Sequence, residues 1–270
     1  MKKIILLCLV VLLTACSGSK DNDNEIIEVS IAIKSNDVIY NNDETIFSAT
    51  TNINVDEITF YFDGKNIGAT ISKPYSITYK PKDIAPGIHE LTCIAKKDNK
   101  DYKNKKTITL YLRLGDDFRG GKIFYLDSTK EHGLISSTED MVNVNDATDH
   151  GFVWGDNNDI ITNLSDGYEN TKKMASVAKS PGYAAYNFKN GYKHNGYDDW
   201  YIPSYNELKL LSENMNYVGN FNRTSISWED YYWSSSQSTE EQAFCINFFA
   251  LSGDNSYKYL SHKVRPIRKF

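Results

Sequence analysis

Hydrophobic and polar residues alternate along much of the first hundred or so residues. The period of two is clearest in three runs: Val29, Ile31 and Ile33; Ile58, Phe60 and Phe62; and Ile108, Leu110, Leu112 and Leu114. Because successive side chains of a strand point to opposite faces, these runs predict strands with one buried face. Turn-forming residues separate the runs at 41–43, 63–64, 85–87 and 98–99. We therefore expect residues 26–114 to form a small all-β sandwich without a long helix.

The pattern changes at the glycine- and charge-rich stretch 115–121, where we place a domain boundary. Residues 170–178 predict a short helix with Met174, Val177 and Ala178 on one face, capped by Asn170 or Thr171. A second helix begins after Pro203, where Ser204 and Glu207 have the spacing of a capping box. Leu208, Leu211 and Met215 would form its apolar stripe.

Strands return near the end of the chain. Phe244, Ile246 and Phe248 alternate with polar residues, residues 252–255 predict a turn, and 264–270 predict a closing strand. Helices and strands in one unit predict an α+β domain over residues 115–270.

The first residues have the form of an export signal. Lys2 and Lys3 precede an apolar run over 4–13, which is too short to cross a bilayer as a helix. The run ends in Leu13-Thr14-Ala15-Cys16, which resembles the lipobox of bacterial lipoproteins. The resemblance implies a signal peptide over 1–15 and acylation of Cys16, and an ordinary signal peptide is the alternative. Residues 16–25 are polar and acidic, which predicts a solvated tether.

Composition narrows the range of partners. The 270 residues carry a formal charge of −5, which argues against nucleic acid. The 19 tyrosines suit contacts with glycans or proteins, although most aromatic residues of a β-rich chain belong to the core. Besides the predicted anchor and the signal peptide, the cysteines are Cys93 and Cys245. We place them in different domains and expect two unpaired buried thiols.

The motif of residues 58–68, ITFYFDGKNIG, precedes Pro74-Tyr75-Ser76 and Gly87-Ile88-His89-Glu90-Leu91. This order resembles bacterial immunoglobulin-like domains, which implies a spacer or adhesion module. Asp63-Gly64 fits a tight turn, so we interpret the motif as structural.

Motifs of the second domain occur in the order of a known family. They are Gly120-Gly121-Lys122-Ile123-Phe124-Tyr125, Asp199-Trp200-Tyr201-Ile202-Pro203-Ser204 with Glu207-Leu208, Tyr232-Trp233-Ser234-Ser235, and Val264-Arg265-Pro266-Ile267-Arg268. They resemble the Lcl C-terminal-like family, named after the end domain of a collagen-like bacterial adhesin. The resemblance implies a C-type-lectin-like fold with paired terminal strands, two helices beside a small sheet, and a long loop region.

Candidate ligand contacts lie in the loops around the first predicted helix. The set, chosen for aromatic faces and polar tips, is Trp154, Asp156, Asn157, Asp159, Tyr183, Tyr186, Tyr192 and Tyr197. Asp156 and Asp159 offer hard oxygen ligands for calcium, but the default is a solvated loop without a metal or cofactor.

Other conspicuous residues have structural interpretations. We expect Trp200, Tyr232 and Trp233 to be core residues rather than sugar platforms. Arg265 and Arg268 either bind an anionic glycan or hold the closing strand through carboxylates. The five histidines show no metal-ligand spacing, and the sequence contains no known catalytic motif.

These patterns predict a non-enzymatic lipoprotein of the bacterial envelope, held in the outer membrane through Cys16 and exposed at the cell surface. A lectin-like domain would bind an extracellular glycan or protein for adhesion. One alternative is an enzyme acting on envelope polysaccharide through a carboxylate pair such as Asp156 with Asp199. Another is a structural subunit of a surface assembly, which would expose an apolar patch or an unpaired edge strand.

Overall fold

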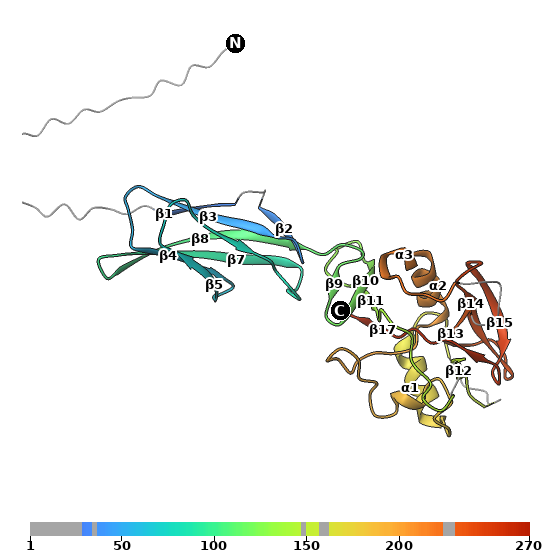
Figure 1. Ribbon diagram of the computed structural model, residues 1–270. Coiled ribbons are helices and arrows are strands. Elements are labelled where there is room, and N and C mark those ends of the chain that lie inside the picture. Colours follow the sequence, from blue (N-terminus) through green and yellow to red (C-terminus); the bar gives the residue numbers. More distant parts are fainter. Residues whose placement is uncertain (1–28, 34–36, 147–149, 157–161, 224–229) are drawn as a thin grey trace, which may run out of the picture.

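The computed structural model describes residues 29–33, 37–146, 150–156, 162–223 and 230–270, and for 29–33 it describes the backbone alone. The predicted signal peptide, Cys16 and the tether lie outside these residues, as do Asn157 and Asp159. Figure 1 shows an elongated β region at one end, here called the sandwich, and a compact α+β region at the other, here called the head. Within the described ranges, no helix combines the length and apolar character that a bilayer span requires.

Two sheets build the sandwich, as the alternating pattern predicts. The strands are β1 (Val29–Ile33), β2 (Val38–Tyr40), β3 (Thr45–Thr51), β4 (Glu57–Phe62), β5 (Lys65–Thr70), β6 (Tyr75–Tyr79), β7 (Gly87–Lys97) and β8 (Lys100–Tyr111). One sheet has the order β2-β8-β7-β4-β5 and the other β1-β3-β6. All neighbours are antiparallel except β2 and β8. Over the part of the sandwich that the structure describes there is no helix, which confirms that expectation.

The turn between β4 and β5 confirms the structural interpretation of Asp63-Gly64. Both residues have positive φ, 48° and 77°, which a tight two-residue hairpin requires. The Asp63 carboxylate also accepts the Glu90 backbone N–H at 2.9 Å and contacts His89 Nδ1 at 2.6 Å. The opposite ring nitrogen of His89 lies 2.9 Å from the Ala85 carbonyl oxygen. Asp63 thus joins its own turn to β7.

The stability of this hairpin should depend on acid pH. Burial raises the pKa of Asp63, but the bonds from Glu90 and His89 outweigh burial and leave this pKa below its ordinary value. A lowered folded-state pKa contributes stability above the unfolded-state pKa, and that contribution disappears as pH falls through the folded-state value. We expect Asp63→Asn to lose stability at about pH 7 and to match the unmodified protein near about pH 2–3.

Chemical unfolding at several pH values measures this difference, which solvent screening keeps below about 1 kcal/mol. Asp98→Asn, at the corresponding turn between β7 and β8, is the matched control because that carboxylate is 81 % exposed. A gap between Asp63→Asn and the unmodified protein that stays constant with pH would contradict the role assigned to Asp63.

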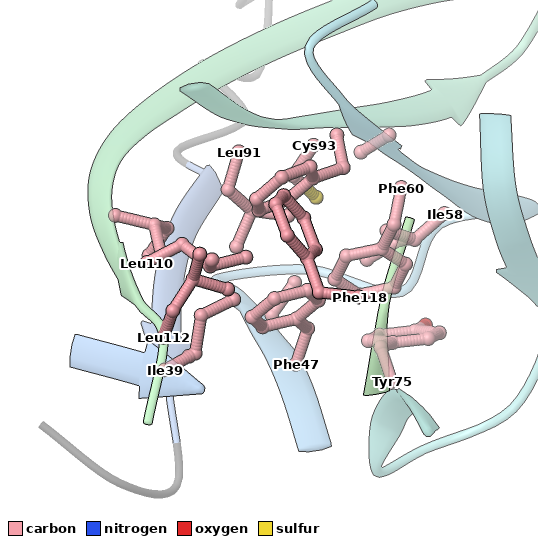
Figure 2. Close-up of a cluster of buried hydrophobic side chains, with 14 of the residues drawn as sticks. Ile39, Phe47, Ile58, Phe60, Tyr75, Leu91, Cys93, Leu110, Leu112 and Phe118 are labelled. Carbon is pink, nitrogen blue, oxygen red and sulfur yellow. The ribbon is translucent and has the colours of Figure 1, made fainter. Parts of the chain in front are cut away.

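Inward-facing residues of both sheets fill the sandwich core. Phe47, Ile58, Phe60, Leu91 and Cys93 are completely buried there, and Figure 2 shows their side chains gathered between the strands. The same cluster of contacts continues through Leu112 and Phe118 to Trp200 of the head. The apolar interior of the sandwich therefore runs into the domain junction without a break.

The strands that the structure describes in the head form three separate sheets. The strands are β9 (Asp117–Phe118), β10 (Gly121–Leu126), β11 (Gly133–Ser136), β12 (Phe152–Val153), β13 (Tyr231–Gln237), β14 (Gln242–Asn247), β15 (Ser252–Tyr257), β16 (Ser261–His262) and β17 (Ile267–Lys269). Their orders are β17-β11-β10-β9, β12-β16 and β13-β14-β15. The closing strand β17 pairs with β11, so the two ends of the head meet in one sheet. In Figure 1 the β13-β14-β15 sheet lies at the far end from the sandwich.

The helices of the head are α1 (Gly167–Val177), the 3-10 turn η1 (Tyr186–Phe188), α2 (Tyr205–Glu213) and α3 (Met215–Val218). The capping box of Ser204 and Glu207 at the start of α2 is confirmed. The predicted cap of α1 is wrong: the helix begins three residues earlier and Asp166 accepts the Glu169 N–H. Asn170 is instead buried, with its side chain bonded to the backbone of Asn163. Met215 lies in α3, beyond Asn214, rather than in α2.

The turn predicted at 252–255 is also wrong. These residues belong to β15, where Gly253 lies opposite Ile246 and Asp254 opposite Cys245. The reversal falls before them, where Asn247 Oδ1 accepts the backbone N–H groups of Phe249 and Ala250. Polar turn formers can occupy β15 because it is an edge strand and nearly all of its residues are exposed to solvent.

Cys93 and Cys245 are free, buried and located in different regions, as predicted. Burial raises the pKa of each thiol to about 12. Thiols with so little thiolate at neutral pH are inert packing groups.

Polar contacts fasten the sandwich to the head. Asn42 Nδ2 donates to the Asp117 carbonyl at 2.8 Å, and the Asp83 carboxylate accepts the Arg119 N–H at 2.6 Å. Arg113, near the end of the sandwich, forms a bidentate pair with Asp43 at 2.7 and 3.0 Å and also lies 3.4 Å from Asp116 beyond the boundary. Since several short contacts join the two regions beside a shared apolar core, the junction is a packed interface rather than a loose linker.

Candidate functional site

Trp154 lies in the core of the head rather than on a loop surface. Its side chain is 2 % exposed, and its indole N–H donates to the Ser234 carbonyl at 2.7 Å. The Lys258 ammonium lies 4.8 Å from the centre of the ring. Both the polar atom and one face of the indole are thus occupied inside the protein, so Trp154 offers no platform to a ligand.

Asp156 and Tyr183, both predicted as ligand contacts, bind each other. The Tyr183 hydroxyl donates to Asp156 Oδ1, and Lys179 Nζ lies 2.9 Å from Oδ2. The bond from Tyr183 and the contact with Lys179 lower the pKa of Asp156. This network ties the end of the 150–156 loop to the segment after α1. Among residues that the structure describes, no three His, Cys, Asp or Glu side chains form a group suited to a metal ion.

The remaining predicted tyrosines are half-buried and pack the long loop between α1 and α2. Tyr192 stacks on His194 with ring centres 6.3 Å apart, and burial raises its pKa. Tyr197 lies against Gly120 and under the Arg268 guanidinium, 4.0 Å from its ring centre. The Lys189 ammonium lies 5.0 Å from the ring of Tyr186. These rings mainly give the loop a fixed shape.

The fixed loop and helix α1 enclose a cleft of about 370 Å³, here called the α1 cleft. This volume falls in the range of small-molecule sites. The lining residues include aromatic, cationic and acidic groups together; they are Tyr168, Thr171, Lys172, Phe188, Gly191, Asp198, Asp199, Trp200 and Tyr201.

The helix side of the α1 cleft presents an aromatic face beside a cation. Tyr168 is 45 % exposed and meets the buried ring of Tyr201 edge to face, with centres 5.9 Å apart. Lys172, one helical turn further on, holds its ammonium 5.3 Å from the Tyr168 ring and 3.0 Å from Glu169. The hydrogen-bonded ion pair with Glu169 raises the pKa of Lys172, so this side chain is a cation at neutral pH.

The loop side of the α1 cleft carries two adjacent exposed carboxylates, Asp198 and Asp199. Asp199 accepts from Arg268 Nη2 at 2.7 Å, and its side chain remains 50 % exposed. A cleft with an exposed tyrosine, a lysine and two carboxylates can stack on the apolar face of a sugar ring while exchanging hydrogen bonds with its hydroxyls.

One buried carboxylate positions the wall of the α1 cleft. Glu207 Oε2 accepts the backbone N–H of Gly167 at 3.0 Å, the N–H of Ser204 at 2.8 Å and the Ser204 hydroxyl at 2.6 Å. Its other oxygen accepts the Tyr201 hydroxyl at 2.9 Å. Glu207 therefore caps α2 and holds the first residue of α1. A Cβ on Gly167 would lie 2.5 Å from this carboxylate, so only glycine permits the close approach.

Both arginines of the closing segment have structural partners. Arg265 is fully buried and donates to Asp140 at 2.6 Å and to the Asn220 carbonyl at 2.7 Å. Arg268 donates to the Arg119 carbonyl at 2.6 Å and to Asp199. The predicted core residues Trp200, Tyr232 and Trp233 are at most 3 % exposed. The structural interpretation accounts for all five residues.

The two carboxylates of the enzymatic alternative lie in different environments. Asp156 is engaged by Tyr183 and Lys179, whereas Asp199 is engaged by Arg268 and lines the α1 cleft. The two do not line a common cavity among those found in the described part of the chain. This arrangement does not provide the facing pair of carboxylates that glycoside hydrolysis uses.

Sequence reasoning missed Tyr168, Lys172 and Asp198 as cleft residues. Tyr168 and Lys172 are four residues apart on one helix, and this spacing, once α1 is placed correctly, puts them on one face. The loop tyrosines were predicted as ligand contacts because aromatic residues in loops suggest exposure. In the structure they pack within the loop instead.

Comparison with known families divides the chain in the same way. The model of the bacterial Ig domain matches residues 29–93, and that of the Lcl C-terminal domain matches residues 142–268. No curated protein matches the chain. A bacterial Ig domain indicates a cell-surface or secreted bacterial protein.

Solved structures align with about a third of the chain. Fibronectin(III)-like modules of Clostridium thermocellum CbhA are 21 % identical, over 33 % of this chain and 48 % of that chain, with a TM-score of 0.26. A Bacteroides uniformis beta-glucuronidase is 16 % identical, over 32 % and 11 %, with a TM-score of 0.24. The CARDB domain of a Pyrococcus furiosus protein is 13 % identical, over 32 % and 90 %, with a TM-score of 0.25. The chain thus spans about half of the first of these structures and a small part of the second.

Proposed function

From a chain in which a bacterial Ig-like region precedes an Lcl C-terminal domain, we propose a non-enzymatic recognition protein of the bacterial cell surface. The head binds an extracellular glycan or protein through the α1 cleft, and the sandwich holds the head away from the envelope. Acylation of Cys16 would anchor the chain in the outer membrane, with residues 16–25 as a tether. Several acyl chains on one residue give a stable anchor, since each buried methylene contributes about 0.8 kcal/mol.

The observation that carries this proposal is the α1 cleft. It is lined by the half-exposed Tyr168 ring and Lys172 from α1, and by Asp198 and Asp199 from the loop. The buried hydrogen bonds of Glu207 hold the wall in place, so a ligand that binds there loses little free energy to ordering of the protein. Such a preformed polar and aromatic cleft fits recognition of a hydroxyl-rich ligand.

The edge strand β15 gives the assembly-subunit alternative no support. The edge strand β15 pairs on one side only, but its sequence, Ser-Gly-Asp-Asn-Ser-Tyr, is polar and carries a charge. Charged and short edges are how sheets avoid pairing with other chains.

Tyr168→Ala tests the cleft directly. A glycan array probed with the purified protein identifies a ligand, and titration of that ligand should show binding weakened roughly tenfold or more, because stacking on one ring contributes about 0.5–1.5 kcal/mol in addition to the area lost. The matched control is Tyr259→Ala, since Tyr259 is 63 % exposed on the turn after β15. Equal affinity of the two variants for every ligand found would mean that the α1 cleft is not the binding site.

A further inference from the structure

A second depression lies at the junction between sandwich and head, and we call it the junction groove. Its volume is about 520 Å³, and it is lined from the end of the sandwich, from β10 and from α3. The floor is apolar: Leu114 and Leu126 are partly exposed in it, and Leu112 and Phe124 are buried beneath them. None of these residues lines the α1 cleft, so the two depressions are separate sites on one chain.

Two tyrosines flank the apolar floor. Tyr125 of β10 is 37 % exposed and Tyr217 of α3 is 47 % exposed. Tyr111 lies close by at 36 % exposure, with the Lys130 ammonium 6.0 Å from its ring centre. Half-exposed tyrosines beside an apolar floor combine flat stacking surfaces with hydroxyls at the solvent edge.

The walls of the junction groove are preformed. The turn that joins sandwich to head is closed by the bond from Arg113 N to Asp116 Oδ2 at 2.9 Å, and Gly115 N donates to the Ile123 carbonyl at 2.8 Å. Gly115 has a φ of +86°, and a Cβ there would lie 3.5 Å from the Tyr217 ring. The turn, β10 and α3 are therefore fixed against one another, although they come from both sides of the domain boundary.

Charges at the rim are nearly balanced. Arg113 contacts Asp43 at 2.7 Å and Asp116 at 3.4 Å, which leaves no excess of positive charge at that end. At the other end Lys130 and Asp127 lie close in sequence, and both line the groove. Such a rim attracts neither a polyanion nor a polycation, but it offers fixed donors and acceptors to hydroxyl groups.

From these features we infer that the junction groove is a second binding site, specific for a neutral oligosaccharide. The C–H faces of pyranose rings would stack on Tyr125 and Tyr217 over the apolar floor. Hydroxyls would exchange hydrogen bonds with polar groups at the rim, among them Lys130 and Asp127. Because sandwich and head both contribute lining residues, the complete site exists only when the two regions are joined.

The experiment is titration of the full chain with a panel of neutral hexasaccharides: cellohexaose, maltohexaose, xylohexaose, mannohexaose and chitohexaose. Saturation-transfer difference NMR and isothermal calorimetry measure binding. We expect at least one member to bind, and Tyr125→Ala and Tyr217→Ala each to weaken it roughly tenfold. Tyr217→Phe keeps the ring and should weaken it by no more than about threefold.

Tyr168→Ala serves as the control for the α1 cleft and should leave this affinity unchanged, so failure of one site is distinguishable from failure of the other. Thermal unfolding of each variant separates loss of binding from loss of fold. The inference is overturned if no hexasaccharide binds, or if binding responds to Tyr168→Ala and not to Tyr125→Ala and Tyr217→Ala. Dimerisation of the chain in sedimentation that is abolished by Tyr217→Ala, without saccharide binding, would identify a second copy as the occupant and would also overturn it.

Discussion

Replacing Arg265 with methionine should destabilise the head by about 3–5 kcal/mol, because the change leaves the largely buried carboxylate of Asp140 without its cation. Arg265 is fully buried, and its Nε lies 2.6 Å from Asp140. Its terminal nitrogens donate to the carbonyls of Ser137, Gly219 and Asn220. One side chain thus satisfies groups from two loops that are distant in sequence.

Tryptophan fluorescence during urea unfolding measures this loss specifically, since the described tryptophans, Trp154, Trp200 and Trp233, lie in the head and residues 26–114 contain none. Arg223→Met is the matched control because Arg223 is exposed, and it should change stability by less than about 0.5 kcal/mol. Replacing Asp140 as well should recover part of the loss, because the stranded charge is then absent. A cost below about 1 kcal/mol for Arg265→Met would show that water reaches Asp140 and replaces the arginine.

The second large effect is expected for Glu207→Gln, at about 2–4 kcal/mol. Both carboxylate oxygens accept hydrogen bonds from buried donors, and an amide has only one acceptor oxygen. The new NH₂ group must therefore face either the Tyr201 hydroxyl or the donors of Gly167 and Ser204. Because these bonds place α1 against α2, binding in the α1 cleft should weaken together with stability.

Glu213→Gln provides the control for charge alone, since Glu213 is exposed in the last turn of α2. Urea unfolding followed by tryptophan fluorescence applies here as well. If Glu207→Gln and Glu213→Gln have the same stability, the hydrogen bonds by which Glu207 caps α2 and holds the first residue of α1 do not stabilise the head.

The sequence was most informative where one physical signal dominates. Period-two alternation correctly predicted the strands β1 and β4, since successive side chains of a strand point to opposite faces. The capping box at Ser204 was equally secure because its two bonds are local. Asp63-Gly64 also needed only neighbouring residues to specify its turn.

Prediction failed where distant residues decide the local structure. Asn170 has the chemistry of a helix cap, but the loop at Asn163 takes up its side chain, so Asp166 caps α1 instead. Gly253 and Asp254 are turn formers that pair with β14 because the reversal is made earlier by Asn247. The α1 cleft was partly missed for the same reason, since its two walls meet only after Glu207 has joined the helices.

The pairing of β17 with β11 has a consequence for how the head can change during evolution. The chain enters the head beside β9 and completes it at β17, and both strands belong to the sheet next to the sandwich. The segment between α1 and α2 contributes no strand to that sheet. Trp200 of this segment packs in the core that reaches the junction, but the exposed positions of the segment can change, and so alter which ligands are selected, without disturbing attachment. Natural selection can then change the ligand specificity of the head through this segment while the attachment of the head to the sandwich stays the same.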